Sequence, residues 1–147
     1  MALGNDQQFW LNGFENFHSG TAIEHLGITL ETIDETSIVL RMPITDKARQ
    51  PYGLLHGGIS MVLAETAASV HACWGIDLTE TQPVGIEING SHVRSAMEGV
   101  VRAEGRVVRR TRIIIVHQVD IFLESTDQLL STARVTNFYR PTKAGVP

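Results

Sequence analysis

Hydrophobic residues in this chain follow two different spacings, one typical of a buried helix and one typical of strands. From His56 to Trp74 the apolar residues fall on every side of a helical wheel that turns about 100° per residue. A helix at the surface of a soluble protein normally carries charges on its outer face. This segment has one acidic residue, Glu65, and therefore predicts a long helix that is buried on both sides.

The segments before this helix are shorter and read as two helices, two strands and a loop. We expect a helix over residues 7–17, a second helix over 22–26 capped by Thr21 and ended by Gly27, strands over 28–33 and 36–44 around a turn at Asp34-Glu35, and a polar loop over 45–55.

Four longer segments after the helix alternate as strands do, with turn residues between them. We expect these strands at about residues 83–94, 98–109, 112–124 and 128–139. Two strands, one buried helix and then four antiparallel strands predict an α+β fold, in which one curved sheet wraps around the helix. The sheet would cover one side of the helix, and a neighbouring subunit can cover the other. We expect a single domain over residues 1–140 and a disordered tail over residues 141–147.

The composition is that of an ordinary globular domain, with 147 residues, of which 43% are hydrophobic and 19% charged. The net charge of −4 argues against nucleic acids and anionic membranes as partners. No apolar run approaches the ~18 residues of a membrane span, and residues 1–10 lack the basic start of a signal peptide. The one cysteine, Cys73, is expected to be a small buried hydrophobe, and the absence of a second cysteine fits a reducing cytoplasm.

Glu65 is the clearest candidate for chemistry, because a lone carboxylate on an apolar helix is costly unless another group pairs with it or a reaction uses it. It is either a hydrogen-bonded structural residue or a catalytic base or nucleophile. Ser69 lies one turn further along on the same face. His56 precedes Glu65 by nine residues, a rotation of about 900°, so the two side chains point to opposite sides. If both serve one reaction, the site needs a second copy of the helix, which predicts a symmetric dimer.

The candidate residues form a spaced motif. Gln50 is followed by His56-Gly57-Gly58, by Glu65 and Ser69, and further along by the segment 87-EINGSHVRS-95. Together with the expected order of elements over residues 20–138, this motif resembles the hotdog-fold acyl-CoA thioesterases of the PaaI-like family. The branch that it resembles most includes the 1,4-dihydroxy-2-naphthoyl-CoA hydrolase of menaquinone biosynthesis and the proofreading thioesterase of the enterobactin pathway.

The resemblance implies a role for each residue of the motif. The Gly57 N–H, at the positive end of the helix, would polarise the thioester carbonyl, with His56 and Gln50 assisting. Glu65 of the partner subunit would attack the carbonyl carbon or deprotonate a water molecule. Ser69 would hold that water or Glu65 itself.

The resemblance also implies which residues contact the substrate and its coenzyme A portion. These residues are Gly85, His92, Val93, Arg94, Ser95, Arg109, Arg110, Thr111 and Arg112. Relatives usually carry a glycine where this chain has Thr111. We therefore expect the backbone path to differ at that turn, while the positive charge is kept.

Several functions stay open at this point. The first is hydrolysis of an acyl-CoA, with an aromatic acyl group favoured by the resemblance. The second is release of a misloaded group from an acyl or aryl carrier protein, and the third is a non-catalytic acyl-CoA sensor; the spacing argues against a hydratase. We expect no cofactor, since coenzyme A enters as part of the substrate, and no metal, since the histidines lack ligand spacing. The family commonly pairs dimers into homotetramers.

Overall fold

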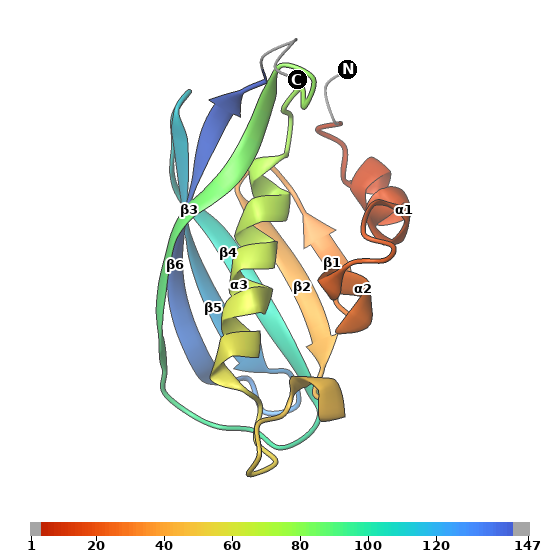
Figure 1. The fold of residues 1–147 in the computed structure, drawn as a ribbon, viewed down its shortest axis with the longest axis vertical. Helices are drawn as coiled ribbons and strands as arrows, with labels where there is room; N and C mark the ends of the chain where they lie inside the picture. The colour runs from red at the N-terminus through yellow and green to blue at the C-terminus, as the bar shows by residue number, and fades with distance from the viewer. Residues whose placement is uncertain (1–3, 143–147) are drawn as a thin grey trace.

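The strands of the protein form one curved sheet, and its longest helix lies across one face of that sheet (Figure 1). The computed structural model describes residues 4–142. The elements in chain order are α1 (Gln7–Phe17), α2 (Ala22–His25), β1 (Thr29–Ile33), β2 (Ser37–Pro43), the short 3-10 helix η1 (Asp46–Ala48), α3 (Gly57–Ala72), β3 (Thr81–His92), β4 (Val100–Arg110), β5 (Ile114–Leu123) and β6 (Gln128–Pro141). Within the described part of the chain, no helix is long and apolar enough to cross a membrane.

The sheet has six strands in the order β1-β2-β4-β5-β6-β3, and every neighbouring pair is antiparallel. Along β2, β4 and β5, buried residues alternate with more exposed ones, as in strands that have one face on a core. The face toward the core contributes fully buried side chains such as Leu40, Val101 and Ile121. This arrangement confirms the predicted α+β fold with a curved sheet packed on a central helix.

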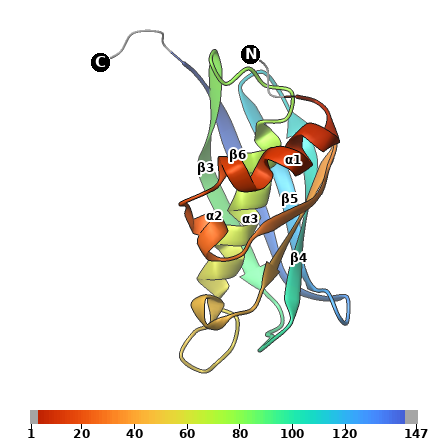
Figure 2. The same ribbon diagram turned by 90° about the vertical axis from the view of Figure 1, so that its right-hand side faces the viewer.

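The central helix α3 packs into the core through small residues. Ala64, Ala67 and Ala68 are fully buried, and short side chains let a helix approach a sheet closely. Elsewhere α1 and α2 cover part of the helix, and Trp10 and Phe14 of α1 belong to the same core (Figure 2). Around Glu65 the cover is incomplete, and this residue is exposed. Within one chain Glu65 is therefore not covered, and burial of this side by a neighbouring subunit stays a prediction.

The turn between β1 and β2 is built by Asp34, as the sequence predicts. Its carboxylate accepts hydrogen bonds from the N–H groups of Thr36 at 2.7 Å and Ser37 at 2.8 Å. The bond from the Thr36 N–H is the largest of several that lower the pKa of Asp34 below its usual value. Thr21 is the N-cap residue of α2, as predicted, and its carbonyl accepts a hydrogen bond from the His25 N–H at 3.0 Å. Its side chain does not cap the helix, because the hydroxyl donates to the His18 carbonyl at 2.5 Å.

The last strand runs further than the sequence predicts. Pro141 pairs with Thr81 at the start of β3, and the Thr142 N–H donates to the Glu80 carbonyl at 2.7 Å. β6 therefore extends one residue past the expected domain boundary at residue 140. It does so because its partner strand β3 begins earlier than expected, at Thr81. The rest of the predicted tail, residues 143–147, lies outside the described residues.

Two buried histidines join α3 to the sheet, although neither belongs to any motif in the sequence. His71 Nδ1 lies 2.7 Å from Nε2 of His117 on β5, and His71 Nε2 lies 2.8 Å from the Asp34 carbonyl oxygen. A carbonyl only accepts, so His71 carries its proton on Nε2 and accepts at Nδ1 from the His117 N–H. Burial lowers the pKa of His71 to about 4 and that of His117 to about 3, so both rings are neutral near pH 7.

Candidate active site

The N-terminus of α3 presents a backbone N–H group that has no partner among the described residues. His56 caps the helix, and its Nδ1 accepts a hydrogen bond from the Gly58 N–H at 2.8 Å. The Gly57 N–H occupies the first helical position, and among residues 4–142 no acceptor binds it. Free N–H groups and the helix dipole make this end of α3 positive, which suits a developing negative charge on oxygen.

His92, at the end of β3, lies directly beside Gly57. A side-chain carbon on Gly57 would come within 2.5 Å of His92 Nε2, so only glycine leaves room here. The His92 ring is fixed from the other side, where Nδ1 is 2.8 Å from Ser131 Oγ on β6. A cavity of about 170 Å³ opens at this point. The structure thus brings five predicted site residues together around it: Gln50, Gly57, His92, Arg94 and Ser95.

Two predicted residues that line this cavity also make local contacts, and a third, Val93, lies outside it. Gln50 Oε1 accepts a hydrogen bond from the Tyr52 N–H of its own loop. Arg94 Nη1 donates to the Leu129 carbonyl at 3.2 Å. Val93 is exposed and does not line the cavity, although the sequence placed it among the substrate contacts.

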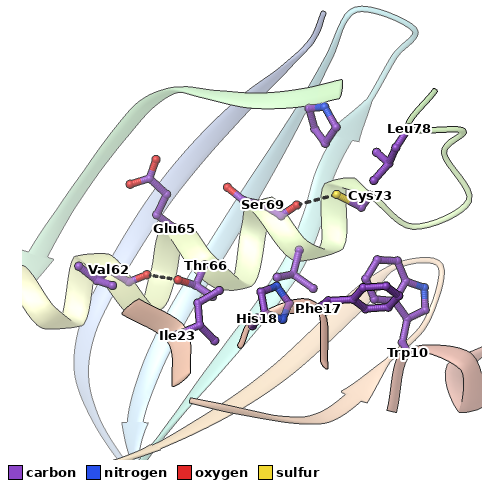
Figure 3. Close-up of a pocket in the computed structure, with 12 residues that line it drawn as sticks. Trp10, Phe17, His18, Ile23, Val62, Glu65, Thr66, Ser69, Cys73 and Leu78 are labelled. Atoms are coloured by element: carbon purple, nitrogen blue, oxygen red, sulfur yellow. Dashed lines mark hydrogen bonds between the residues drawn. The ribbon is translucent and has the colours of Figure 1, made fainter. Parts of the chain in front are cut away.

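A second and larger cavity, of about 620 Å³, runs along the middle and C-terminal half of α3 (Figure 3). Figure 3 shows Glu65, Ser69 and Cys73 following one another along the helix, with side chains of α1 opposite its last turns. Most of the lining is apolar or aromatic. The lining residues are Trp10, Phe17, His18, Ile23, Val62, Glu65, Thr66, Ser69, Val70, Cys73, Leu78 and Pro83.

The Glu65 carboxylate lies against the backbone of the edge strand β3. A side-chain carbon on Gly85 would come within 2.6 Å of Glu65 Oε1. The ladder between β3 and β6 is irregular at this point, with a register shift between Gly85 and Glu87. The missing side chain at Gly85 therefore makes the room that the carboxylate occupies.

Ser69 receives a hydrogen bond from a residue that sequence reasoning missed. Asn137 on β6 is fully buried, and its Nδ2 donates to Ser69 Oγ at 3.0 Å. A signal was present in the sequence, because Asn137 interrupts the run of inward-facing apolar residues Ala133, Val135 and Tyr139 on the same strand. An amide at such a position needs either hydrogen bonds or a function to offset its burial.

Within one chain the two halves of the predicted site lie apart. Gly57 and Glu65 are separated by eight residues of the same helix, which is roughly 12 Å along its axis. They line different cavities, one shared with His92 and the other with Ser69. A small thioester group bound at the Gly57 N–H is therefore out of reach of the same chain's Glu65.

The predicted arginine cluster lies at the opposite end of α3 from Gly57. Arg110 donates to the Trp74 carbonyl at 3.1 Å and to the His71 carbonyl at 3.4 Å, where a cation complements the C-terminus of a helix. Arg109 and Arg112 are exposed. The structure therefore does not bring the cluster to His92 and Arg94 within one chain.

Thr111 explains how the arginine turn closes without the glycine common among relatives. Its Oγ1 accepts from the N–H groups of Ile113 at 3.1 Å and Ile114 at 3.0 Å, and it donates to the Ile114 carbonyl at 3.1 Å. A hydroxyl that bonds to the backbone just ahead of it is a common way to stabilise a tight turn. The departure from the family pattern thus has a local structural reason.

Two further polar side chains of the larger cavity, Thr66 and Cys73, donate hydrogen bonds to the backbone of α3. Thr66 Oγ1 donates to the Val62 carbonyl at 2.7 Å, and Cys73 Sγ donates to the Ser69 carbonyl at 3.4 Å. Burial raises the pKa of the Cys73 thiol to about 11, so it is not a nucleophile near pH 7. Among residues 4–142, no group of histidine, cysteine and acidic side chains is arranged to hold a metal ion.

Comparison with known proteins agrees with this fold and motif. Residues 52–130 match the family model described as the thioesterase superfamily. A 1,4-dihydroxy-2-naphthoyl-CoA hydrolase of Escherichia coli is 39% identical over 117 residues, which cover 80% of this chain and 85% of the relative. A hydrolase of the same name from Listeria monocytogenes is 35% identical over 113 residues, which cover 77% of this chain and 90% of the relative.

A solved structure gives the same result for the fold. A mutant of thioesterase PA1618 from Pseudomonas aeruginosa superposes with a TM-score of 0.85 at 30% identity, covering 89% of this chain and 94% of that one. The chain belongs to the thioesterase superfamily, and its fold is the hotdog fold of these enzymes. It is a thioester hydrolase.

Proposed function

We propose that the protein hydrolyses acyl-CoA thioesters in a site shared by two subunits, with the Gly57 N–H from one and Glu65 from the other. One observation carries this proposal: the free Gly57 N–H and Glu65 lie on one helix but line different cavities. A dimer related by a two-fold axis supplies both groups to each of two equivalent sites. The relatives named as 1,4-dihydroxy-2-naphthoyl-CoA hydrolases support coenzyme A as the thiol portion of the substrate.

In the proposed reaction the thioester oxygen accepts a hydrogen bond from the Gly57 N–H, which polarises the carbonyl. Glu65 of the partner subunit then attacks the carbonyl carbon to form an anhydride, or takes a proton from a water molecule that attacks. In both routes the carbon–sulfur bond breaks. In the general-base route Glu65 passes the proton taken from water to the leaving sulfur of coenzyme A. In the anhydride route the sulfur leaves as a thiolate that takes a proton from solvent, and water then cleaves the anhydride, which releases the acid and frees Glu65. Water supplies the second oxygen of the product acid, and Ser69 orients that water.

The larger cavity supports an aromatic acyl group such as 1,4-dihydroxy-2-naphthoyl. Its volume of about 620 Å³ is within the range of small-molecule sites. Trp10, Phe17 and Leu78 are among its lining residues, and aromatic and apolar side chains suit a flat apolar substituent. An enzyme with this substrate would serve menaquinone biosynthesis in the cytoplasm.

Charge supports coenzyme A over a carrier protein as the substrate's thiol portion. Arg94 lines the cavity at Gly57, and the exposed Arg109 and Arg112 of the partner subunit would complete a site for nucleotide phosphates. A carrier-protein pantetheine has no nucleotide for these arginines to bind. Pairing of two such dimers into a tetramer is the expected assembly.

The test is thiol release from a panel of aryl-CoA and alkyl-CoA thioesters, with the native protein beside Glu65→Gln. We expect fast hydrolysis of aryl-CoA substrates and a loss of at least about 10³-fold in the variant, because it removes the reacting carboxylate. Glu35→Gln, in the exposed turn between β1 and β2, is the matched control and should keep full activity. Equal rates for native protein and Glu65→Gln would overturn the assignment of Glu65. A higher kcat/KM for an aroyl carrier protein than for the aroyl-CoA would show that the preferred substrate is the carrier-protein thioester.

A further inference from the structure

Asn137 is a buried polar side chain that the proposed mechanism does not yet use. It is fully buried on β6, and its backbone pairs with Gly85 on one side and Ile115 on the other. Its Nδ2 donates to Ser69 Oγ at 3.0 Å, while among residues 4–142 nothing donates to its Oδ1. A buried acceptor without a donor destabilises a fold, and a leucine would fill the position without that cost. Such a conflict between residue and environment is typical of functional sites.

Asn137 and Glu65 approach the same point from two sides. Measured from the position of a side-chain carbon on Gly85, Glu65 Oε1 is 2.6 Å away and Asn137 Nδ2 is 3.8 Å away. Ser69 completes the group through its bond to Asn137 and lines the same cavity as Glu65. The three polar side chains therefore form one cluster around the bare α-carbon of Gly85.

We infer that Asn137 is a positioning residue that keeps the Ser69 hydroxyl as a hydrogen-bond donor toward the cavity in which Glu65 acts. A serine hydroxyl has one proton and two lone pairs. Because Asn137 donates into a lone pair of Oγ, the Ser69 proton is left to point elsewhere. The inference rests on the proposed roles of Glu65 and Ser69.

A backbone carbonyl of α3 is an alternative acceptor for the Ser69 hydroxyl proton. Hydroxyls on helices often donate to the carbonyl four residues earlier, and Thr66 does so to Val62 at 2.7 Å. For Ser69 the equivalent acceptor is the backbone carbonyl of Glu65. Without the hydrogen bond from Asn137, the Ser69 hydroxyl is free to turn to that carbonyl and is lost as a donor to the reacting water or carboxylate.

The experiment is a double-mutant cycle of Asn137→Ala and Ser69→Ala, read as kcat and KM with an aryl-CoA substrate. We expect Asn137→Ala to lower kcat about tenfold with KM changed less than about twofold, as for loss of one hydrogen bond in the reacting state. In the Ser69→Ala background the same change should have no further effect on kcat, because Asn137 acts through Ser69. Thr136→Val, the neighbouring residue whose side chain faces the other side of the sheet, should keep the native kcat.

The remaining outcomes show what would overturn this inference and how its failure differs from failure of the proposed function. A multiplicative loss in the double variant would overturn the inference, and so would a native kcat for Asn137→Ala. If Ser69→Ala keeps the native kcat while Glu65→Gln is inactive, the inference fails and the role of Glu65 stands. If Asn137→Ala does not fold, Asn137→Asp decides the question. Its carboxylate accepts the Ser69 proton, so kcat should fall at least as far as in Ser69→Ala, and a native kcat would contradict the inference.

Discussion

The neutral pair of His71 and His117 should make the folded state sensitive to mild acid. Burial lowers the pKa of His71 to about 4 and that of His117 to about 3, against about 6.5 for an unfolded histidine. Between these values the unfolded chain binds more protons than the folded one. The stability that the folded state gains from the neutral His71–His117 pair is therefore fully present above pH 6.5 and is lost as the pH falls toward 4.

The size of this loss follows from the two pKa differences. Between pH 6 and pH 5 each unfolded histidine takes up most of one proton, which is worth about 1.2 kcal/mol for each ring. The free energy of unfolding should then fall by about 2.4 kcal/mol over that single pH unit. Acidic groups with lowered pKa values, such as Asp34, contribute at lower pH, so this interval isolates the histidines.

The assay is urea unfolding at fixed protein concentration, at steps of pH between 5 and 6. Trp10 and Trp74 are buried and report unfolding by fluorescence. In His117→Gln the side-chain amide can still donate to His71 Nδ1 but does not titrate, so the pH dependence should fall to about half. The control His25→Gln changes an exposed histidine, and in this variant the pH dependence of the free energy of unfolding should match that of the native protein. If the free energy of unfolding of the native protein falls by less than about 1 kcal/mol between pH 6 and pH 5, the reasoning is refuted.

Two glycines and one tryptophan give further predictions. Gly85→Ala should lower kcat at least about tenfold, because the new carbon would lie 2.6 Å from Glu65 Oε1 and displace the carboxylate; an unchanged kcat would show that Glu65 has room to spare. Gly57→Ala should lower kcat/KM by about 10²-fold or more, since its side chain would come within 2.5 Å of His92 Nε2 beside the carbonyl site; steady-state kinetics near the native value would argue against that site. Trp10→Ala should lower the free energy of unfolding by about 3–5 kcal/mol in urea titrations, as for a buried aromatic residue; a loss under about 1 kcal/mol would mean that α1 packs loosely.

The sequence predicts most of the fold because periodic patterns determine it directly. The patterns predicted every α-helix and strand to within a few residues, while the short 3-10 helix η1 lies in the segment predicted as a loop. The ends of β3 and β6 were missed because each strand continues only as far as its partner does. The residues at the end of one strand do not indicate where the partner strand, far away in the sequence, begins or ends.

The site was predictable where it forms a linear motif and unpredictable where it depends on contacts across the sheet. The residues around Gly57 gather at one end of α3, as the resemblance to the family implied. Asn137 is 68 residues from Ser69 in the sequence, and no local pattern links the two. The His71–His117 pair was hidden for the same reason, since a buried ring and an exposed one look alike in a sequence.

Glu65 is exposed in the structure of a single chain, although the apolar pattern of its helix predicts burial. A carboxylate on an apolar helix indicated burial, yet the sheet, α1 and α2 leave Glu65 itself exposed. An apolar helix face is a signal for contact with something, and the pattern does not say whether the partner lies in the same chain. A second subunit over this face would account for both the apolar pattern and the separated halves of the site.

Subunit complementation tests the shared site most directly. Glu65→Gln and Gly57→Ala chains carrying different tags would be co-expressed, and oligomers holding both tags purified and assayed with an aryl-CoA substrate. Each variant alone should be nearly inactive, while a mixed dimer has one site with both defects and one intact site, and should show about half of the native kcat. Mixed oligomers no more active than the two parents would contradict a site built from two subunits.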